Sequence, residues 1–170
     1  MDGSYEMLLR DRFVNGMAHA AFTVSVVTTN GAAGQGGVTV SAMTSVSADM
    51  PNPTLLICVH HKSLTAPMIA KNGVFCVNVL RQDQAHIADT FAGRVDLQGE
   101  DKFTCAKWHP MGSGAARLVD GLVAFDCRIQ SAERVGTHHV FVGAVEEMHL
   151  SDSGHPLVYS NRAYCRADPL

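Results

Sequence analysis

The chain has 170 residues, of which 46% are hydrophobic and 17% are charged, and its formal net charge is −3. This length fits one domain over residues 1–170, which can bury a core without disulfides or a metal. The slight negative charge excludes a chain-wide basic surface for nucleic acid or anionic membranes. The charged fraction is lower than usual, which predicts further buried surface such as a homodimer interface.

The sequence also indicates the cellular compartment of the protein and the redox state of its cysteines. No apolar run reaches the length of about 18 residues that a membrane-spanning helix needs, and no secretory signal pattern opens the chain. The cysteines number five, an odd count, and lack a CxxC pair, which favours reduced thiols over a disulfide framework or a zinc site. We therefore expect a cytoplasmic protein without a metal ion, bound neither to nucleic acid nor to a membrane.

The first predicted elements are a helix and a strand. Residues 5–18 carry apolar side chains at helical spacing, so we expect an amphipathic helix within residues 1–20. Residues 22–29 are rich in β-branched side chains and end at Asn30-Gly31, which indicates a strand and a hairpin turn.

A glycine-rich stretch and a second strand come next. Residues 31–37 lack the spacing and the following helix of a dinucleotide-binding motif, so we interpret them as a hairpin loop. Residues 38–47 alternate apolar and small polar side chains, which predicts one half-buried strand.

Two strands then alternate with two helices. The apolar runs 54–60 and 74–80 are typical of strands. Residues 63–73 predict a helix that Ser63 or Thr65 caps and Gly73 ends. Residues 82–91 predict a short helix stopped by Gly93.

The last third of the chain is predicted to be mainly strands. We expect residues 94–116 to form an irregular surface excursion and residues 122–130 and 138–150 to form a long hairpin about Gly136. Residues 156–159 predict a short closing strand. The strands do not alternate regularly with helices, which favours an antiparallel barrel with flanking helices over a doubly wound parallel sheet.

Three features bear on function. The small hydroxyl side chains of strand 37–47 either leave its main chain open to a planar heteroaromatic ligand or simply face solvent. The segment His60-His61-Lys62-Ser63-Leu64-Thr65 opens a helix and is either an anion site or an ordinary cap. His138 and His139 are adjacent on a strand, so at most one faces a site. Without a GxSxG motif or a metal-binding spacing, a cofactor is expected to supply the chemistry.

In order and spacing, several segments resemble the short-chain flavin reductases, the reductase components of two-component aromatic monooxygenases of the 4-hydroxyphenylacetate and phenol hydroxylase type. The resemblance extends over residues 13–165. It rests on Phe13-x-x-x-Met17 and on residues 23–29, 37–47, 53–56, 77–80, 83–84, 91–93, 122–127, 136–143 and 156–159.

This resemblance implies a mainly β protein, an antiparallel Greek-key FMN-binding split barrel that works as a homodimer. It also implies that NADH or NADPH reduces FAD or FMN by direct hydride transfer, and that the reduced flavin passes to a partner monooxygenase.

The resemblance further implies a set of site residues, none of them a catalytic acid or base. Its members would contact the isoalloxazine edge (Thr39, Val40, Ser41, Ala42), the ribityl and phosphate part (Cys58, Val59, His60, Ser63, Thr65), the flavin near a helix end (Phe91, Ala92, Gly93), its open face (Phe103), and the nicotinamide nucleotide (His138, with Tyr164 closing the cleft).

The chain departs from the family pattern at three places. Phe22-Thr23 stands where the family carries Thr-Gly before the first strand, Thr137 stands where it carries Asp before the histidine, and His60-His61 replaces small or amide residues. Two alternatives stay open: a non-enzymatic flavin- or haem-binding split barrel, and a pyridoxamine-phosphate-oxidase-like flavoenzyme.

Overall fold

The computed structural model describes residues 3–49 and 51–170, and its main feature is a seven-stranded sheet in the order β3-β2-β6-β9-β10-β5-β4. All neighbouring strands are antiparallel. The strands are β2 (Ser25–Thr29), β3 (Gly36–Val40), β4 (Met43–Ser47), β5 (Thr54–His60), β6 (Val74–Val79), β9 (Val123–Val135) and β10 (His138–Leu150).

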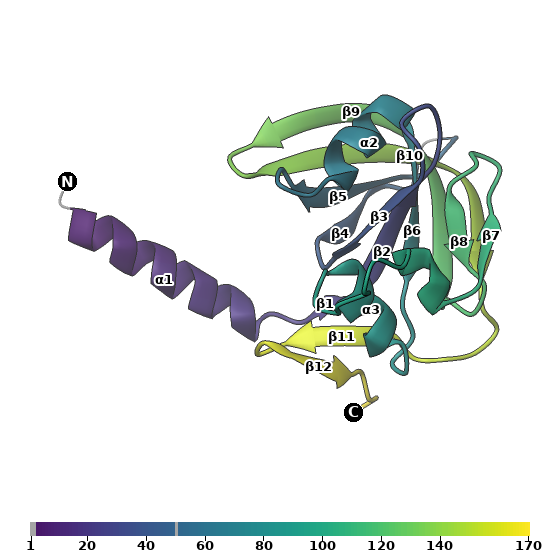
Figure 1. The fold of residues 1–170 in the computed structure, drawn as a ribbon. Helices are drawn as coiled ribbons and strands as arrows, with labels where there is room; N and C mark the ends of the chain where they lie inside the picture. Colours follow the sequence, from purple (N-terminus) through teal and green to yellow (C-terminus); the bar gives the residue numbers. More distant parts are fainter. Residues whose placement is uncertain (1–2, 50) are drawn as a thin grey trace.

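The sheet curls into a barrel because its two edge strands are consecutive in the chain. β3 and β4 lie at opposite ends of the strand order, yet only Ser41 and Ala42 separate them. Such a link spans at most about 11 Å. The two edges must therefore meet at this corner (Figure 1). The mainly β, antiparallel split-barrel prediction is confirmed.

The prediction of a single strand over residues 38–47 is wrong at this same corner. The run breaks at Ser41 and Ala42 because the chain passes there from one edge of the sheet to the other. The hairpin turn at Asn30-Gly31 is confirmed, since β2 and β3 pair with Ser25 opposite Val40. The predicted first strand is interrupted at Val24, between β1 (Phe22–Thr23) and β2.

The glycine-rich stretch is more than a loop. Gly36 and Gly37 belong to β3 and are buried. A Cβ on Gly37 would lie 2.6 Å from the ring of Phe91, so only glycine lets the third helix pack against this strand.

Two short helices cover the barrel as predicted. In α2 (Thr65–Asn72), Ser63 Oγ accepts a hydrogen bond from the Thr65 N–H at 3.2 Å, and Gly73 ends the helix with φ +72°. α3 (Ala85–Phe91) is followed by Gly93 with φ +71°. The barrel core contains Val27, Ile57, Phe75, Val77 and Phe141, and a second core lies between the barrel and α3.

α1 (Gly3–His19) confirms the predicted helix, whose first two residues fall outside the described part of the chain. It does not pack an apolar face on the barrel but projects from it (Figure 1), with Leu8, Leu9 and Phe13 exposed. Its base is held by the turn after β11, where the Asn161 N–H donates to the Ala18 carbonyl at 2.6 Å. No helix in the described residues has both the length and the apolar character to cross a membrane.

Residues 94–116 are not wholly irregular. They include a 3-10 helix η1 (Lys102–Cys105) and β7 (Trp108–Pro110), which pairs with β8 (Ala116–Leu118). The long β9–β10 hairpin is confirmed, with φ +57° at Gly136.

The predicted closing strand does not join the barrel. It is β11 (Leu157–Ser160), which pairs with β1 and with β12 (Ala163–Arg166) in a separate three-stranded sheet. β12 has no signal in the sequence because the turn before it contains no glycine. Asn161 and Arg162 adopt positive φ there, at 50° and 60°.

One buried side chain joins three strands. Asn78 is fully buried in β6, where its Oδ1 accepts the Leu118 N–H at 2.7 Å. Its Nδ2 donates to the carbonyls of Val26 at 3.1 Å and Ala116 at 3.2 Å. The side-chain amide of Asn78 therefore links β6 to β2 and β8.

Asn78→Ala removes these bonds and leaves the buried Leu118 N–H without its acceptor. We expect the free energy of unfolding to fall by about 2–4 kcal/mol, measured by urea denaturation at constant m-value. The exposed Asn52, which donates to one carbonyl at 3.0 Å, provides the matched control. Equal losses for Asn78→Ala and Asn52→Ala would contradict this role.

A second polar contact ties the C-terminal hairpin to α3. The Tyr164 hydroxyl donates to Asp89 Oδ1 at 2.7 Å, and Arg94 donates to both groups at 3.1 Å and 3.3 Å. Burial, together with the hydrogen bond to Asp89, raises the pKa of Tyr164 from 10.0 to about 12. The folded protein therefore holds this proton more tightly than the unfolded chain.

The contact should stabilise the fold fully below pH 10 and be lost as the pH rises towards 12. We expect the wild-type protein to lose stability more steeply than Tyr164→Phe across this window, measured by denaturant unfolding at several pH values. Parallel curves for the two proteins would show that the hydroxyl does not couple folding to proton binding.

Candidate functional site

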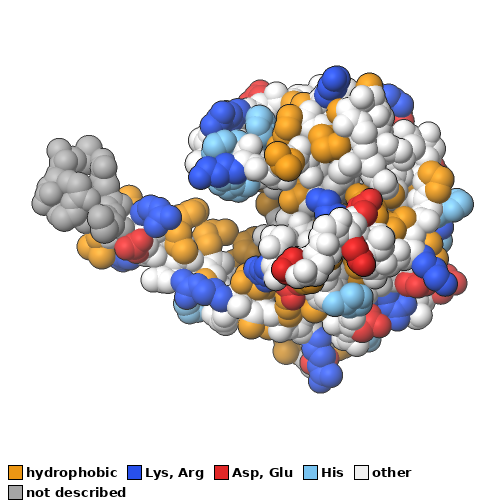
Figure 2. Space-filling view, in the orientation of Figure 1, with side chains coloured by type: hydrophobic (Ala, Val, Ile, Leu, Met, Phe, Trp, Pro, Cys, Tyr) orange, Lys and Arg blue, Asp and Glu red, His pale blue; other side chains and the backbone are white. Residues whose placement is uncertain are grey.

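Three cavities meet at Ser41, in the link between β3 and β4. The first, of about 480 Å³, lies between β3 and the ends of β5 and β10. The second, of about 170 Å³, lies between β3, the end of α3 and the C-terminal hairpin. The third, of about 350 Å³, lies beside the base of α1. A notch between α1 and the barrel is visible in Figure 2.

The first cavity brings together most of the predicted flavin-contacting residues. Its lining includes Thr39, Val40, Ser41, Ala42, Cys58, Val59, His60 and His138. These residues come from β3, the corner, β5 and β10, so three separate parts of the sequence converge as the resemblance implies.

The main chain of β3 offers free hydrogen-bonding groups beside this cavity. β3 is an edge strand, and the Gly37 carbonyl points away from β2, since it accepts the Thr65 hydroxyl at 3.0 Å and the Lys102 amine. Because main-chain groups alternate along a strand, the N–H and C=O of Thr39 also point away from β2. A donor and an acceptor side by side fit the alternating edge of a flavin ring.

The hydroxyl of Thr39 has a structural role instead. It donates to the Ala88 carbonyl at 2.7 Å, which ties β3 to α3. The alternative that the hydroxyls of this strand simply face solvent is therefore wrong at Thr39. The other alternative, in which the main chain of the strand is open to a ligand, agrees with the structure.

Ser63 and Thr65 do not line these cavities. The Ser63 hydroxyl accepts the Thr65 N–H, and the buried Thr65 hydroxyl donates to Gly37. Both hydroxyls thus take part in hydrogen bonds within the fold. The predicted contact of Ser63 and Thr65 with a ribityl or phosphate group stays a prediction.

Phe91 and Phe103 support the site from behind rather than facing the cavities. Phe91 is buried, and its ring lies 5.1 Å from that of Phe103 and 5.4 Å from that of Trp108, in edge-on arrangements. Phe103 is half-buried in this packing, and its contact with the open face of a flavin stays a prediction. Ala92 lines the second cavity, and Gly93 follows it in the turn that ends α3.

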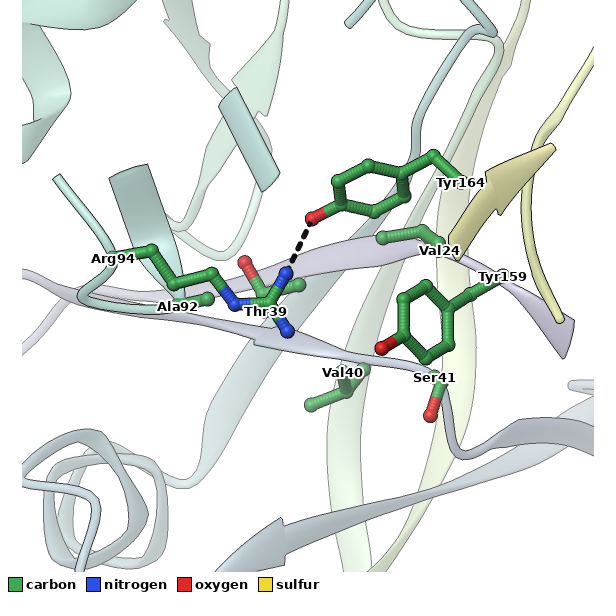
Figure 3. A pocket seen from close by; sticks show the side chains of 8 residues that line it. All are labelled: Val24, Thr39, Val40, Ser41, Ala92, Arg94, Tyr159 and Tyr164. Carbon is green, nitrogen blue, oxygen red and sulfur yellow. Dashed lines mark hydrogen bonds between the residues drawn. The ribbon is translucent and has the colours of Figure 1, made fainter. Parts of the chain in front are cut away.

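Tyr164 lines the second cavity, whereas His138 lines the first, and the second cavity also contains two residues that the sequence did not predict (Figure 3). Arg94 and Tyr159 approach it from the turn after α3 and from β11, and the Tyr164 hydroxyl points at the Arg94 guanidinium. Arg94 lies in a segment without periodicity, so no sequence signal singles it out.

The histidines divide between the two faces of the sheet, as predicted. His138 lies directly opposite His60 in the β10–β5 register, their ring centroids are 5.0 Å apart, and both line the first cavity. His139 instead stacks on Phe141 at 5.8 Å. Burial raises the pKa of the Cys58 thiol, which therefore stays neutral beside them.

The comparison with protein families gives one extended match. The model for the flavin reductase like domain covers residues 17–168. FMN reductase (NADH) RutF 1 of a Methylorubrum extorquens strain is 40% identical over 152 residues, or 89% of this chain and 74% of the relative. RutF of Acinetobacter baylyi is 37% identical and covers 90% of this chain and 79% of the relative.

Similar solved structures are also flavin reductases. BorF, the flavin reductase component of a bacterial two-component tryptophan halogenase, superposes with a TM-score of 0.82 at 28% identity, covering 94% of this chain and 99% of that one. The NADH:FAD oxidoreductase SgcE6 of Streptomyces globisporus gives a TM-score of 0.84 at 26% identity, with 94% of each chain covered. With the family match over nearly its whole length and the open strand edge at its corner, the chain belongs to the flavin reductase family.

Proposed function

We propose that this protein uses NADH to reduce FMN or FAD by direct hydride transfer and then releases the reduced flavin. The observation that carries the proposal is the first cavity, where the free main-chain edge of Thr39 and the side chain of His138 line the same space. Relatives named as NADH-dependent FMN reductases favour NADH over NADPH.

When bound, the flavin supplies a ring that accepts a hydride from the reduced nicotinamide. The chain's own contribution is binding and orientation: the Thr39 main chain holds the ring edge, and His138 positions the nicotinamide nucleotide. Alignment of two reactants can lower the activation barrier by up to roughly 7–11 kcal/mol. Hydride transfer needs no proton from the chain.

We further propose that the reduced flavin serves a separate monooxygenase. The described lining of the first cavity has histidines but neither lysine nor arginine, so its interior offers no permanent cation to retain the flavin. Loose retention suits a reductase that must let its product leave. Among the similar structures, one is named as nitrilotriacetate monooxygenase component B, and BorF is named as the flavin reductase component of a two-component tryptophan halogenase.

Mixing the protein anaerobically with each pairing of NADH or NADPH and FMN or FAD tests the reaction. We expect NADH oxidation well above the flavin-only blank, followed by absorbance, and loss of flavin from the protein on dialysis. No oxidation above the blank would indicate a binding protein. Flavin retained stoichiometrically through dialysis would favour the pyridoxamine-phosphate-oxidase-like alternative.

We also propose that the chain works as a homodimer through the outer face of β5 and β10. Cross-strand pairing places Val142 beside Leu56 and Val140 beside Cys58 on this face, and all four are only partly buried. Cavity residues His60 and His138 lie on the same face, so a second copy seated there would border the site.

Sedimentation equilibrium should give twice the chain mass of 18.2 kDa for the wild-type protein. Val142→Glu places a charge on this apolar face and should shift the protein to monomer, whereas Gln130→Glu, at an exposed position of β9, should not. A wild-type monomer at high concentration would rule the proposal out.

A further inference from the structure

A charged side chain reaches the open edge of β3 from the segment after α3. Lys102 begins the 3-10 helix η1, and its ammonium donates a hydrogen bond to the carbonyl of Gly37. The same carbonyl accepts the hydroxyl of Thr65 at 3.0 Å. Two donors therefore occupy the outward-pointing carbonyl that lies two residues before Thr39 on the strand.

This arrangement determines which main-chain groups of β3 a ligand can use. A carbonyl oxygen has two lone pairs, and the Gly37 carbonyl has a donor for each of them. The next outward-pointing group is the N–H of Thr39, because outward groups come from alternate residues of a strand. Equivalent atoms of such residues are only about 6.5 Å apart along the strand. The charge of Lys102 therefore lies next to the groups proposed to hold the flavin ring.

The ammonium of Lys102 is fixed in place and only partly solvated. The side chain is half-buried, and Nζ lies 5.3 Å from the centroid of the Phe91 ring. Burial lowers the pKa of the Lys102 ammonium, and the charge of Asp101 partly opposes this shift. A charge in such surroundings acts over a longer distance than one in bulk water, because the effective dielectric constant is lower.

No direct ion pair cancels this charge. Within residues 3–49 and 51–170, no carboxylate lies within ion-pair distance of Lys102. The neighbouring Asp101 side chain accepts the Phe103 N–H at 3.0 Å, which caps η1. The positive charge of Lys102 therefore acts on the strand edge.

A cation at this edge affects the two redox states of a flavin differently. Hydride transfer adds two electrons and one proton to the neutral oxidised ring, and the nicotinamide becomes the oxidised cation. The reduced ring then carries one negative charge until it takes up a further proton. A fixed positive charge stabilises this anion more than it stabilises the neutral oxidised ring.

We propose that Lys102 is a positioning residue that makes the edge of β3 favour reduced over oxidised flavin. It neutralises the negative end of the Gly37 carbonyl dipole and places a positive charge beside the Thr39 main chain. Lys102 lines none of the cavities that meet at Ser41, so it acts through β3 rather than by contact. The inference rests on the proposed function and concerns the flavin ring, not its phosphate.

The reduction potential of bound riboflavin tests this role, because riboflavin has the ring but no phosphate. An anaerobic dithionite titration against a reference dye, with saturating protein, gives the Kd of the oxidised form relative to that of the reduced form. We expect Lys102→Met, which keeps an apolar side chain over Phe91, to lower this ratio about fivefold, equivalent to about 20 mV. Lys102→Gln should give the same loss, and Lys102→Arg should restore the wild-type potential.

Two controls separate the charge of Lys102 from its packing. Thr65→Val removes the uncharged donor to the same carbonyl, so it should change the Kd of both redox states by one factor and leave the potential unchanged. Lys107→Gln removes an exposed charge that lines none of the three cavities, and it should also leave the potential unchanged.

An unchanged riboflavin potential in Lys102→Met and Lys102→Gln would overturn the proposal and leave Lys102 as a support for the strand. A shift seen with FMN but not with riboflavin would assign Lys102 to the phosphate and overturn it as well. The wild-type reductase assay decides the proposed function separately, since it uses no variant. An active wild-type reductase with unshifted variants would therefore contradict this inference alone.

Discussion

The architecture depends on the two residues that join opposite edges of one sheet. Ser41 and Ala42 carry the chain from β3 to β4, so the sheet must close on itself at that point. The closure does not pair β3 with β4 as neighbours, and β3 keeps the main-chain groups of Thr39 free. An unpaired strand edge normally invites aggregation. Here it borders cavities and is covered in part by helices, which makes it suitable for binding a planar ring.

Several contacts fix this edge. The Thr39 hydroxyl reaches α3, the Gly37 carbonyl accepts from Thr65 and Lys102, and Gly37 leaves room for the Phe91 ring. The hydroxyls of Thr39 and Thr65 and the missing side chain of Gly37 hold the strand in place. The main-chain N–H and C=O of Thr39 therefore stay available to a ligand. Tyr164 and Arg94 then close the second cavity from the C-terminal hairpin and the turn after α3.

The sequence predicted those helices and strands whose bounds are set by residues close to them in the chain. β5, α2 and the β9–β10 hairpin follow from an apolar run, a terminal Gly73 and a turn at Gly136. Three features required tertiary information. The break at Ser41 comes from barrel closure, the turn at Asn161 lacks glycine, and the α1 side chains remain exposed although their spacing suggests an amphipathic face.

The same distinction applies to the site. The resemblance implied ligand contacts for Thr39, His60 and His138, and the structure places all three in one cavity. Each lies on a strand or at its end, where pairing with the neighbouring strand fixes its position. It also implied ligand contacts for Ser63 and Thr65, and only the structure shows that their hydroxyls form hydrogen bonds within the fold. Arg94 could not be found from spacing, since its place in the second cavity arises from Tyr164, which is distant in sequence.

Amide hydrogen exchange at β3 tests the central claim most directly. Val40 pairs with Ser25 and its N–H points at β2, whereas the N–H of Thr39 points away from β2. The account predicts that saturating FMN slows exchange at Thr39 far more than at Val40. Unchanged exchange at Thr39 while FMN is bound would contradict the claim that this strand edge holds the flavin.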